Sequence, residues 1–310
     1  MMEKGLHDIE NLTREDLELV LQTSDTFLEI CTRKVKKIPT LRGKTICLFF
    51  IEPSTRTRIS FEIAAKRMSA DVINFTASTS SLQKGESLTD TVKTIMAMGV
   101  DLFVLRHSAP GSSRKVEQVA GVPVINGGDG PHAHPTQAML DLYTIYRHKK
   151  KFQDLKVAII GDIFHSRVAR SNIFSLTKMG VDVTLCGPPT LIPKEIEKLG
   201  VRVTYSVEDA CRNADVIMCL RMQLERQQSG LFPSMREYIQ LFRIDDRRFA
   251  LAKDDAIIMH PGPMNRGIEI TPEIAYHPRS VIEEQVTNGV AVRMALFYLL
   301  LGRGNEEITD

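Results

Sequence analysis

The chain has 310 residues, of which 43% are hydrophobic and 25% are charged, a composition typical of globular proteins with a substantial core. Its formal net charge of +2 argues against a broad basic surface, so nucleic acid and anionic membranes are poor candidate partners. A chain this long suggests about two domains, at roughly 100–200 residues each.

The cysteines have neither the CxxC spacing nor the histidine spacing of a zinc site, so we expect no metal. They are Cys31, Cys47, Cys186, Cys211 and Cys219. We expect buried free thiols, which fit a reducing compartment. The first residues, MMEKGLHDIENL, lack the apolar region of a signal peptide. No stretch approaches the ~18 uncharged apolar residues of a membrane span. These features favour a cytoplasmic protein.

Short β-branched runs alternate with helical periodicity along the first half of the chain. Thr13 with Asp16 resembles the capping box that opens a helix. Further helices are predicted from about Ile59, from Ser87 and from Pro135. Strands are predicted at residues 45–51, 71–75, 101–105 and 122–125.

The polar segment RHKKKFQD, residues 147–154, is the best candidate for a domain boundary, and its charges indicate a solvated helix end. The pattern then restarts, with a helix over 166–179 and a last helix that stops at Gly302. Strands are predicted at 156–161, 181–186, 201–204, 216–220 and 256–259. This alternation predicts an α/β fold of two domains, each a parallel sheet flanked by helices. Because such folds bind ligands at the carboxyl ends of strands, the loops that follow strands are the candidate site.

The segment PSTRTR, residues 53–58, lies between a predicted strand and a predicted helix. Ser54, Thr55 and Thr57 offer hydroxyl groups, Arg56 offers a guanidinium group, and the helix start offers free N–H groups. Together these donors suit a phosphate. A helix cap with surface arginines is the alternative, but a cap does not need so many donors. A P-loop is excluded, because GxxxxGK[ST] is absent.

Other candidate groups lie in loops further along the chain. They are Lys84 in SSLQKGES, Arg106 after the 101–105 strand, His134 and Gln137 in HAHPTQ, Arg167 in GDIFHSR, Arg221 and Gln223 in LRMQ, and the backbone of the loop HPGPMNRG. Each alone could be structural or solvated. Together, in a chain of nearly zero net charge, they predict one pocket for a small, multiply anionic ligand.

The motifs PSTRTR, HPTQ and HPGP, in this order and spacing, resemble those of the carbamoyltransferase family. The similarity runs from about Leu12 to Gly302, and PSTRTR with HPTQ resembles the family's carbamoyl phosphate site. These two motifs do not identify the second substrate, because ornithine carbamoyltransferases have closely similar motifs.

Three features resemble the aspartate branch of the family. Lys84 precedes Gly85-Glu86, residues 221–223 match the RxQ carboxylate-binding motif, and the last loop reads HPGP where ornithine enzymes usually have HCLP. The charges agree, since aspartate brings two carboxylates that guanidinium groups can hold, whereas ornithine brings an extra cation. The resemblance therefore implies transfer of a carbamoyl group from carbamoyl phosphate to L-aspartate, a step of pyrimidine biosynthesis.

The resemblance also implies domains and partners. Residues 1–147 would bind carbamoyl phosphate, residues 148–285 would bind aspartate, and a C-terminal helix over 286–310 would pack back on the first domain. The family forms homotrimers, in which the loop with Ser80 and Lys84 reaches the neighbouring subunit's active site. It uses no cofactor, and some members join larger assemblies with regulatory chains or dihydroorotase.

The family's site residues carry over by motif. For the phosphate they are Ser54, Thr55, Arg56, Thr57, Arg106 and Lys84 of an adjacent chain. For the carbonyl oxygen they are Thr57, Arg106 and His134. For the carbamoyl NH2 they are Gln137 and the backbone carbonyls of Gly262 and Pro263. For the aspartate carboxylates they are Arg167, Arg221, Gln223 and Lys84.

Two other functions remain open from the sequence. A carbamoyltransferase with another acceptor, ornithine or an acetylated amino acid, is the nearer alternative. A catalytically dead scaffold that only binds carbamoyl phosphate is disfavoured, because no expected site position is visibly substituted. Gly262 stands where some aspartate enzymes have leucine, and we expect little effect because the family uses the backbone there.

Overall fold

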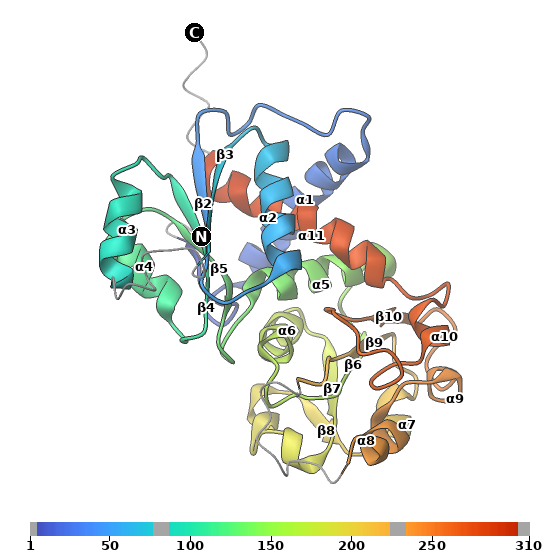
Figure 1. The fold of residues 1–310 in the computed structure, drawn as a ribbon. Coiled ribbons are helices and arrows are strands. Elements are labelled where there is room, and N and C mark those ends of the chain that lie inside the picture. The colour runs from blue at the N-terminus through green and yellow to red at the C-terminus, as the bar shows by residue number, and fades with distance from the viewer. Residues whose placement is uncertain (1–4, 77–86, 224–233, 303–310) are drawn as a thin grey trace. The chain divides into compact units, whose positions relative to one another are not determined.

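The computed structural model describes residues 5–76, 87–223 and 234–302, and the chain divides into two compact units. The first unit comprises Met1–Leu140 and Val286–Asp310, and the second comprises Asp141–Gln285. The chain passes from one unit to the other within helices α5 (Pro135–Lys149) and α11 (Ile282–Phe297) (Figure 1). Each unit contains a five-stranded sheet whose strand pairs are all parallel, which confirms the predicted fold class.

The sheet of the first unit has the strand order β1-β5-β4-β2-β3. Its strands are β1 (Gly5–Leu6), β2 (Thr45–Phe50), β3 (Asp71–Thr76), β4 (Leu102–His107) and β5 (Val124–Asp129). In the register of β2 with β4, Phe50 lies opposite Arg106. The carboxyl ends of β2, β4 and β5 therefore lie side by side, and the loops that follow them share one edge of the sheet.

Helices cover both faces of this sheet, as Figure 1 shows. They are α1 (Arg14–Thr32), α2 (Thr55–Arg67) and part of α11 on one face, and α3 (Leu88–Met96) and α4 (Ser112–Ala120) on the other. The predicted capping box of α1 is confirmed, because Thr13 and Asp16 each accept a hydrogen bond from the other's backbone N–H. Between the sheet and α3 with α4, Phe49, Phe103 and Val92 belong to one buried cluster.

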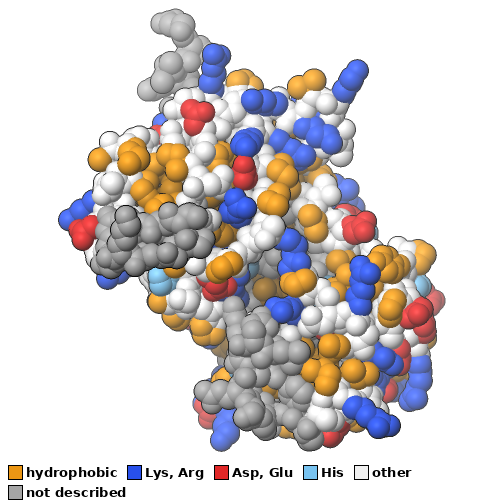
Figure 2. Space-filling model, viewed as in Figure 1, with side chains coloured by type: hydrophobic (Ala, Val, Ile, Leu, Met, Phe, Trp, Pro, Cys, Tyr) orange, Lys and Arg blue, Asp and Glu red, His pale blue; other side chains and the backbone are white. Residues whose placement is uncertain are grey.

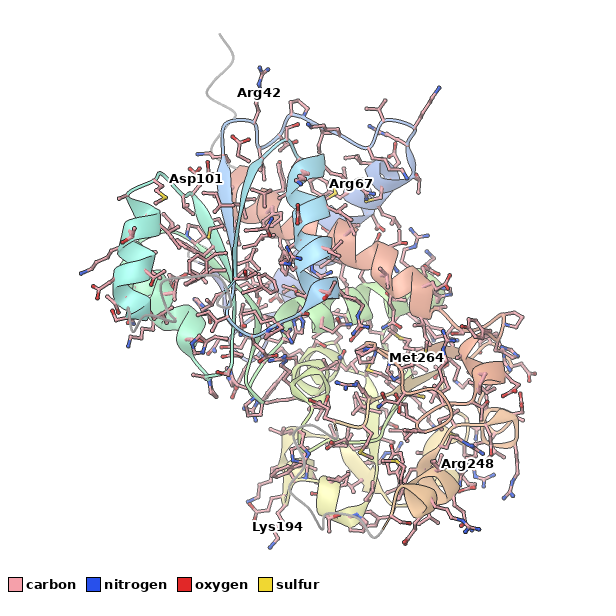
Figure 3. The ribbon with its side chains drawn as sticks, viewed as in Figure 1. Arg42, Arg67, Asp101, Lys194, Arg248 and Met264 are labelled. Atoms are coloured by element: carbon pink, nitrogen blue, oxygen red, sulfur yellow. The ribbon has the colours of Figure 1, made fainter. Side chains whose placement is uncertain are left out.

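The sheet of the second unit has the strand order β10-β9-β6-β7-β8. Its strands are β6 (Lys156–Ile160), β7 (Asp182–Cys186), β8 (Arg202–Thr204), β9 (Val216–Cys219) and β10 (Ile257–Met259). Its helices are α6 (Arg167–Lys178), α7 (Val207–Cys211), α8 (Met235–Phe242), α9 (Asp246–Phe249) and α10 (Pro272–Ala275). Arg248 of α9, labelled in Figure 3, joins this helix to α7 and α8. Its guanidinium donates to the Glu208 carboxylate of α7, to the Gln240 carbonyl of α8 and to the Arg243 carbonyl between α8 and α9.

Several element boundaries differ from the prediction, among them the start of α2 and the end of β4. Helix α2 begins at Thr55, four residues before Ile59, because its first turn is polar and lacks the apolar periodicity that marks a helix in a sequence. Strand β4 continues through Arg106 to His107, where His107 still pairs with Asp129 of β5 across an irregular register. Backbone pairing extends a strand past its last apolar residue, and this pairing leaves no mark in the hydrophobic pattern.

The prediction of buried free thiols is confirmed, since all five cysteines are free and buried. Burial raises the pKa of Cys47, Cys186 and Cys211 to about 12, so these thiols stay protonated. One helix among the described residues, Ile282–Gly302, is long and apolar enough to cross a membrane, but 72% of its most apolar window is buried. Such burial is typical of a core helix.

Candidate functional site

The amino-terminal end of α2 is built to attract an anion. Ser54 takes the N-cap position, but its side chain makes no cap hydrogen bond, and the first turn contains no acidic residue. No side-chain cap from Ser54 therefore competes for the first N–H groups of the helix, and no acidic residue of its first turn offsets the positive end of its dipole. Thr55 and Arg56 are exposed in this turn, and Thr57 is half-buried beside them. The structure thus places four of the predicted phosphate ligands in one helical turn.

Arg106 lies beside this turn, at the carboxyl end of β4. Its backbone carbonyl accepts hydrogen bonds from the N–H groups of Ile51 and Glu52, at 2.9 and 3.2 Å. Its guanidinium donates to the Glu52 carboxylate at 2.6 Å and to the Gly127 carbonyl at 3.0 Å. The loop from β2 to α2 is therefore fastened to Arg106, which brings a nine-tenths buried positive charge to the edge where α2 begins.

His134 and Gln137 mark the start of α5, after β5. The His134 carbonyl accepts the N–H of Gln137 at 3.0 Å, and the His134 side chain is buried. The buried carboxylate of Asp129 holds this connection, because it accepts the Ala133 N–H at 3.0 Å and the Gly111 N–H at 2.8 Å. The carboxyl ends of β2, β4 and β5 thus carry all the described candidates of the first unit.

In the second unit, Arg167 is the first residue of α6, just after β6. Ser166 caps this helix, since its hydroxyl accepts the Ala169 N–H at 3.1 Å. The Arg167 side chain is buried although it carries a positive charge, so it is a strong candidate to meet a carboxylate.

Arg221 and Gln223 follow β9, which is the neighbour of β6 in the sheet. The Gln223 amide donates to the backbone carbonyl of His165 at 3.1 Å, which joins the loop after β9 to the loop after β6. The His165 ring in turn contacts the fully buried Asp162 carboxylate at 3.0 Å. Arg167, Arg221 and Gln223 therefore belong to loops that touch at one edge of this sheet.

The loop after β10 adjoins these two loops. It contains a cis peptide bond between Gly262 and Pro263. The Asn265 side chain donates to the Met222 carbonyl at 3.2 Å, between Arg221 and Gln223. The post-strand loops of β6, β9 and β10 are thus linked by hydrogen bonds, as their place at the carboxyl ends of neighbouring strands requires.

The predicted residues fall into two groups, one in each unit. Ser54, Thr55, Arg56, Thr57, Arg106, His134 and Gln137 lie in the first unit, and Arg167, Arg221, Gln223, Gly262 and Pro263 lie in the second. Ser80 and Lys84 lie outside the described residues. Sequence reasoning missed the acids that hold the loops, namely the half-buried Glu52 and the buried Asp129, Asp162 and Glu269. Their position next to the basic motifs was the available signal.

Lys and Arg side chains are spread over the viewed face among hydrophobic and acidic ones (Figure 2). Among the described residues, no group of three His, Cys, Asp or Glu side chains could hold a metal ion.

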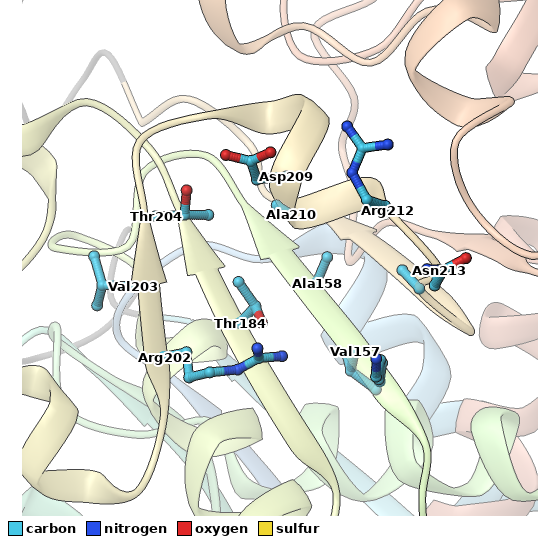
Figure 4. A pocket seen from close by; sticks show the side chains of 12 residues that line it. Val157, Ala158, Thr184, Arg202, Val203, Thr204, Asp209, Ala210, Arg212 and Asn213 are labelled. Carbon is cyan, nitrogen blue, oxygen red and sulfur yellow. The ribbon is translucent and has the colours of Figure 1, made fainter.

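A cavity of about 350 Å³ in the second unit lies apart from the residues above (Figure 4). Lys156, Arg202, Asp209 and Asn213 line it, together with residues of strands β6, β7 and β8.

Two family descriptions match this chain in succession. Residues 4–147 match "Aspartate/ornithine carbamoyltransferase, carbamoyl-P binding domain", and residues 153–300 match "Aspartate/ornithine carbamoyltransferase, Asp/Orn binding domain". Together they cover nearly all of the sequence.

Relatives and solved structures agree with this match. The aspartate carbamoyltransferase catalytic subunit of Moorella thermoacetica is 55% identical over 98% of this chain and 99% of that protein. The aspartate transcarbamoylase of Trypanosoma cruzi, solved with carbamoyl phosphate and aspartate, has a TM-score of 0.87 and 29% identity, covering 96% of this chain and 97% of that one. The ornithine carbamoyltransferase of Pyrococcus furiosus has a TM-score of 0.85 and 28% identity, with the same coverage.

Proposed function

We propose that this chain, which belongs to the aspartate/ornithine carbamoyltransferase family, transfers the carbamoyl group of carbamoyl phosphate to the amine of L-aspartate. The products are N-carbamoyl-L-aspartate and phosphate. One observation carries the choice of aspartate, namely the 55% identity to a full-length aspartate carbamoyltransferase catalytic subunit. The fold alone does not distinguish aspartate from ornithine as the acceptor, because the aspartate and ornithine enzymes resemble this chain almost equally in structure.

The first unit binds carbamoyl phosphate in this proposal. The phosphate lies at the uncapped start of α2, where Ser54, Thr55, Arg56 and Thr57 surround the positive end of the helix dipole. Arg106, fixed by Glu52 and the Gly127 carbonyl, adds a guanidinium group from the adjacent strand.

The carbamoyl group is activated by hydrogen-bond donors. Thr57, Arg106 and His134 point at the carbonyl oxygen and stabilise the negative charge that develops on it when the amine attacks. Gln137 and the backbone carbonyls of Gly262 and Pro263 orient the carbamoyl NH2. The neutral amine attacks the carbon, the C–O bond to phosphate breaks, and the departing phosphate takes the proton.

The second unit binds aspartate. Arg167, Arg221 and Gln223, from the linked loops after β6 and β9, hold the two carboxylates. Guanidinium groups suit this task because they grip carboxylates through two parallel hydrogen bonds. An ornithine side chain would bring its cation toward these arginines and would be repelled.

The protein works as a homotrimer with shared sites in this proposal. Ser80 and Lys84 of a neighbouring subunit complete each site, with Lys84 contacting the phosphate and an aspartate carboxylate. The reaction needs no cofactor in this proposal, since acyl transfer from an acyl phosphate to an amine needs only charge stabilisation. We place the enzyme in the cytoplasm and in pyrimidine biosynthesis.

The test is to incubate the purified chain with carbamoyl phosphate and L-aspartate and to measure both products. Phosphate and N-carbamoyl-L-aspartate should appear in equal amounts. Phosphate release with no carbamoylated product, or binding of carbamoyl phosphate with no turnover, would contradict the proposal and would favour a scaffold.

A further inference from the structure

The loop after β10 is anchored by one buried acid that the catalytic account does not use. Glu269 is 2% exposed, and its Oε1 accepts the Asn265 N–H at 2.6 Å and contacts His260 Nε2 at 3.2 Å. His260 Nδ1 accepts the Gly262 N–H at 2.8 Å. Because a backbone N–H can only donate, Nδ1 has no proton, and the ring proton sits on Nε2 and donates to Glu269. The backbone of Asn265 is therefore fixed.

The same loop is tied to three helices through a buried chain of hydrogen bonds. The His260 N–H donates to the Gln285 side chain at 2.9 Å, and Gln285 donates to Asp141 at 2.7 Å. Asn172 of α6 donates to the other oxygen of Asp141 at 2.8 Å. All of these side chains are at most 3% exposed, so the base of the loop is rigid.

The side chain of Asn265 reaches from this base to the neighbouring loop. Its amide donates to the Met222 carbonyl at 3.2 Å, and Met222 is fully buried between Arg221 and Gln223. Met264, the preceding residue, is labelled in Figure 3 and packs against the core of the second unit. The Asn265 contact thus joins a fixed loop to the residue that separates the two candidate aspartate ligands.

We propose that Asn265 is a positioning residue for aspartate binding, which acts by holding the backbone between Arg221 and Gln223. The inference rests on the proposed function, because it takes these two side chains as the carboxylate ligands. A fixed Met222 carbonyl limits where both ligands can point, since they leave the backbone on either side of it. Losing the bond costs affinity for aspartate. It leaves the carbamoyl phosphate residues of the first unit untouched, and the bond from the Gly262 N–H to His260 still holds the part of the loop with Gly262 and Pro263.

The test compares Asn265→Ala and Asn265→Asp with the matched control Asn213→Asp. Asn213 is exposed and lies before β9, at the other edge of the same sheet. The KM for aspartate should rise about 3- to 10-fold in both Asn265 variants, as expected for one hydrogen bond. The KM for carbamoyl phosphate and the thermal unfolding midpoint should match those of the control.

Each other outcome overturns the proposal. An unchanged KM for aspartate would show that the bond does not position the ligands. A rise in Asn265→Asp alone would assign the effect to the added negative charge. Equal rises in both KM values, or a lowered unfolding midpoint in Asn265→Ala, would assign Asn265 a general structural role. Wild-type chain that forms no N-carbamoyl-L-aspartate would refute the proposed function instead, which keeps the two failures distinct.

Discussion

Arg106 keeps a full positive charge in a setting where charge is costly. Its side chain is 10% exposed, and the Glu52 carboxylate and the Gly127 carbonyl compensate for the lost water. Such a cation is preorganised, because it does not need to reorient when negative charge develops on a substrate. The sequence identified Arg106 only by its place after an apolar run. The half-buried partner Glu52 directly precedes PSTRTR, but this position alone does not show that its carboxylate meets the strand-end Arg106.

We predict that Arg106→Ala lowers kcat by at least about 10²–10³-fold, as expected for the loss of an oxyanion donor. Arg114→Ala is a matched control, because Arg114 also pairs with a carboxylate, Asp8, at 2.6 Å in the same unit. Circular dichroism should show that both variants remain folded. Near-normal turnover of Arg106→Ala would show that this guanidinium does not stabilise the reacting carbonyl.

His107, next to Arg106, should make stability depend on pH. Burial lowers its pKa below the ordinary value of 6.5, although the charges of Glu52 and Asp129 act in the opposite direction. The unfolded chain therefore takes up this proton at a higher pH than the folded chain, so the free energy of unfolding falls as the pH drops through the interval below 6.5.

Replacement of His107 by Asn removes this effect and keeps an acceptor for the Ala109 N–H, which His107 Nδ1 accepts at 2.8 Å. In urea titrations, the free energy of unfolding of His107→Asn minus that of wild type should increase as the pH is lowered from about 7.5 to about 5.5. Parallel pH profiles of the two proteins would contradict the lowered pKa.

At the scale of elements, the helix starts show what a sequence can and cannot reveal. The capping box at Thr13 could be predicted, because both partners lie three residues apart and the bonds are local. The start of α2 at Thr55 could not be predicted, because Ser54 makes no side-chain cap and the first turn is polar. That missing cap is also what suits the turn to the proposed phosphate. The short helices α7, α9 and α10 were missed because four or five residues carry no periodicity.

Thr13→Ala should lower the free energy of unfolding by about 1 kcal/mol, because the Asp16 N–H in the first turn of α1 loses the Thr13 hydroxyl as its acceptor. Thr32→Ala, at the other end of α1, is the control. Its exposed hydroxyl donates only to the Glu29 carbonyl, so the change should stay within about 0.5 kcal/mol. Equal effects of the two substitutions in thermal unfolding would argue against the capping box.

At the scale of the whole molecule, each unit supplies one part of the proposed reaction. The sequence predicted the residues of both parts, since each follows a strand and parallel strands end at a common edge. It could not predict the bonds that join the loops, such as Gln223 to the His165 carbonyl and Asn265 to the Met222 carbonyl. These contacts link residues about 40 to 60 positions apart and depend on the strand order of the sheet.

The shared site can be tested by mixing inactive chains. Lys84→Ala and Arg56→Ala should each be inactive alone, because every site then lacks one phosphate ligand. In trimers reassembled from equal amounts, about one quarter of the sites should pair an intact Arg56 with an intact neighbouring Lys84. Activity should return to that extent, measured as carbamoylated product per chain. Mixtures as inactive as their components would show that each chain holds a complete site.

The most direct measurement of the central claim is kcat/KM for L-aspartate against L-ornithine, at saturating carbamoyl phosphate. Arg167 and Arg221 bind two carboxylates in this account, so they should reject an acceptor that brings a cation in place of the second carboxylate. The account predicts a preference for aspartate of at least about 10³-fold. Equal use of the two acceptors, or a preference for ornithine, would contradict it.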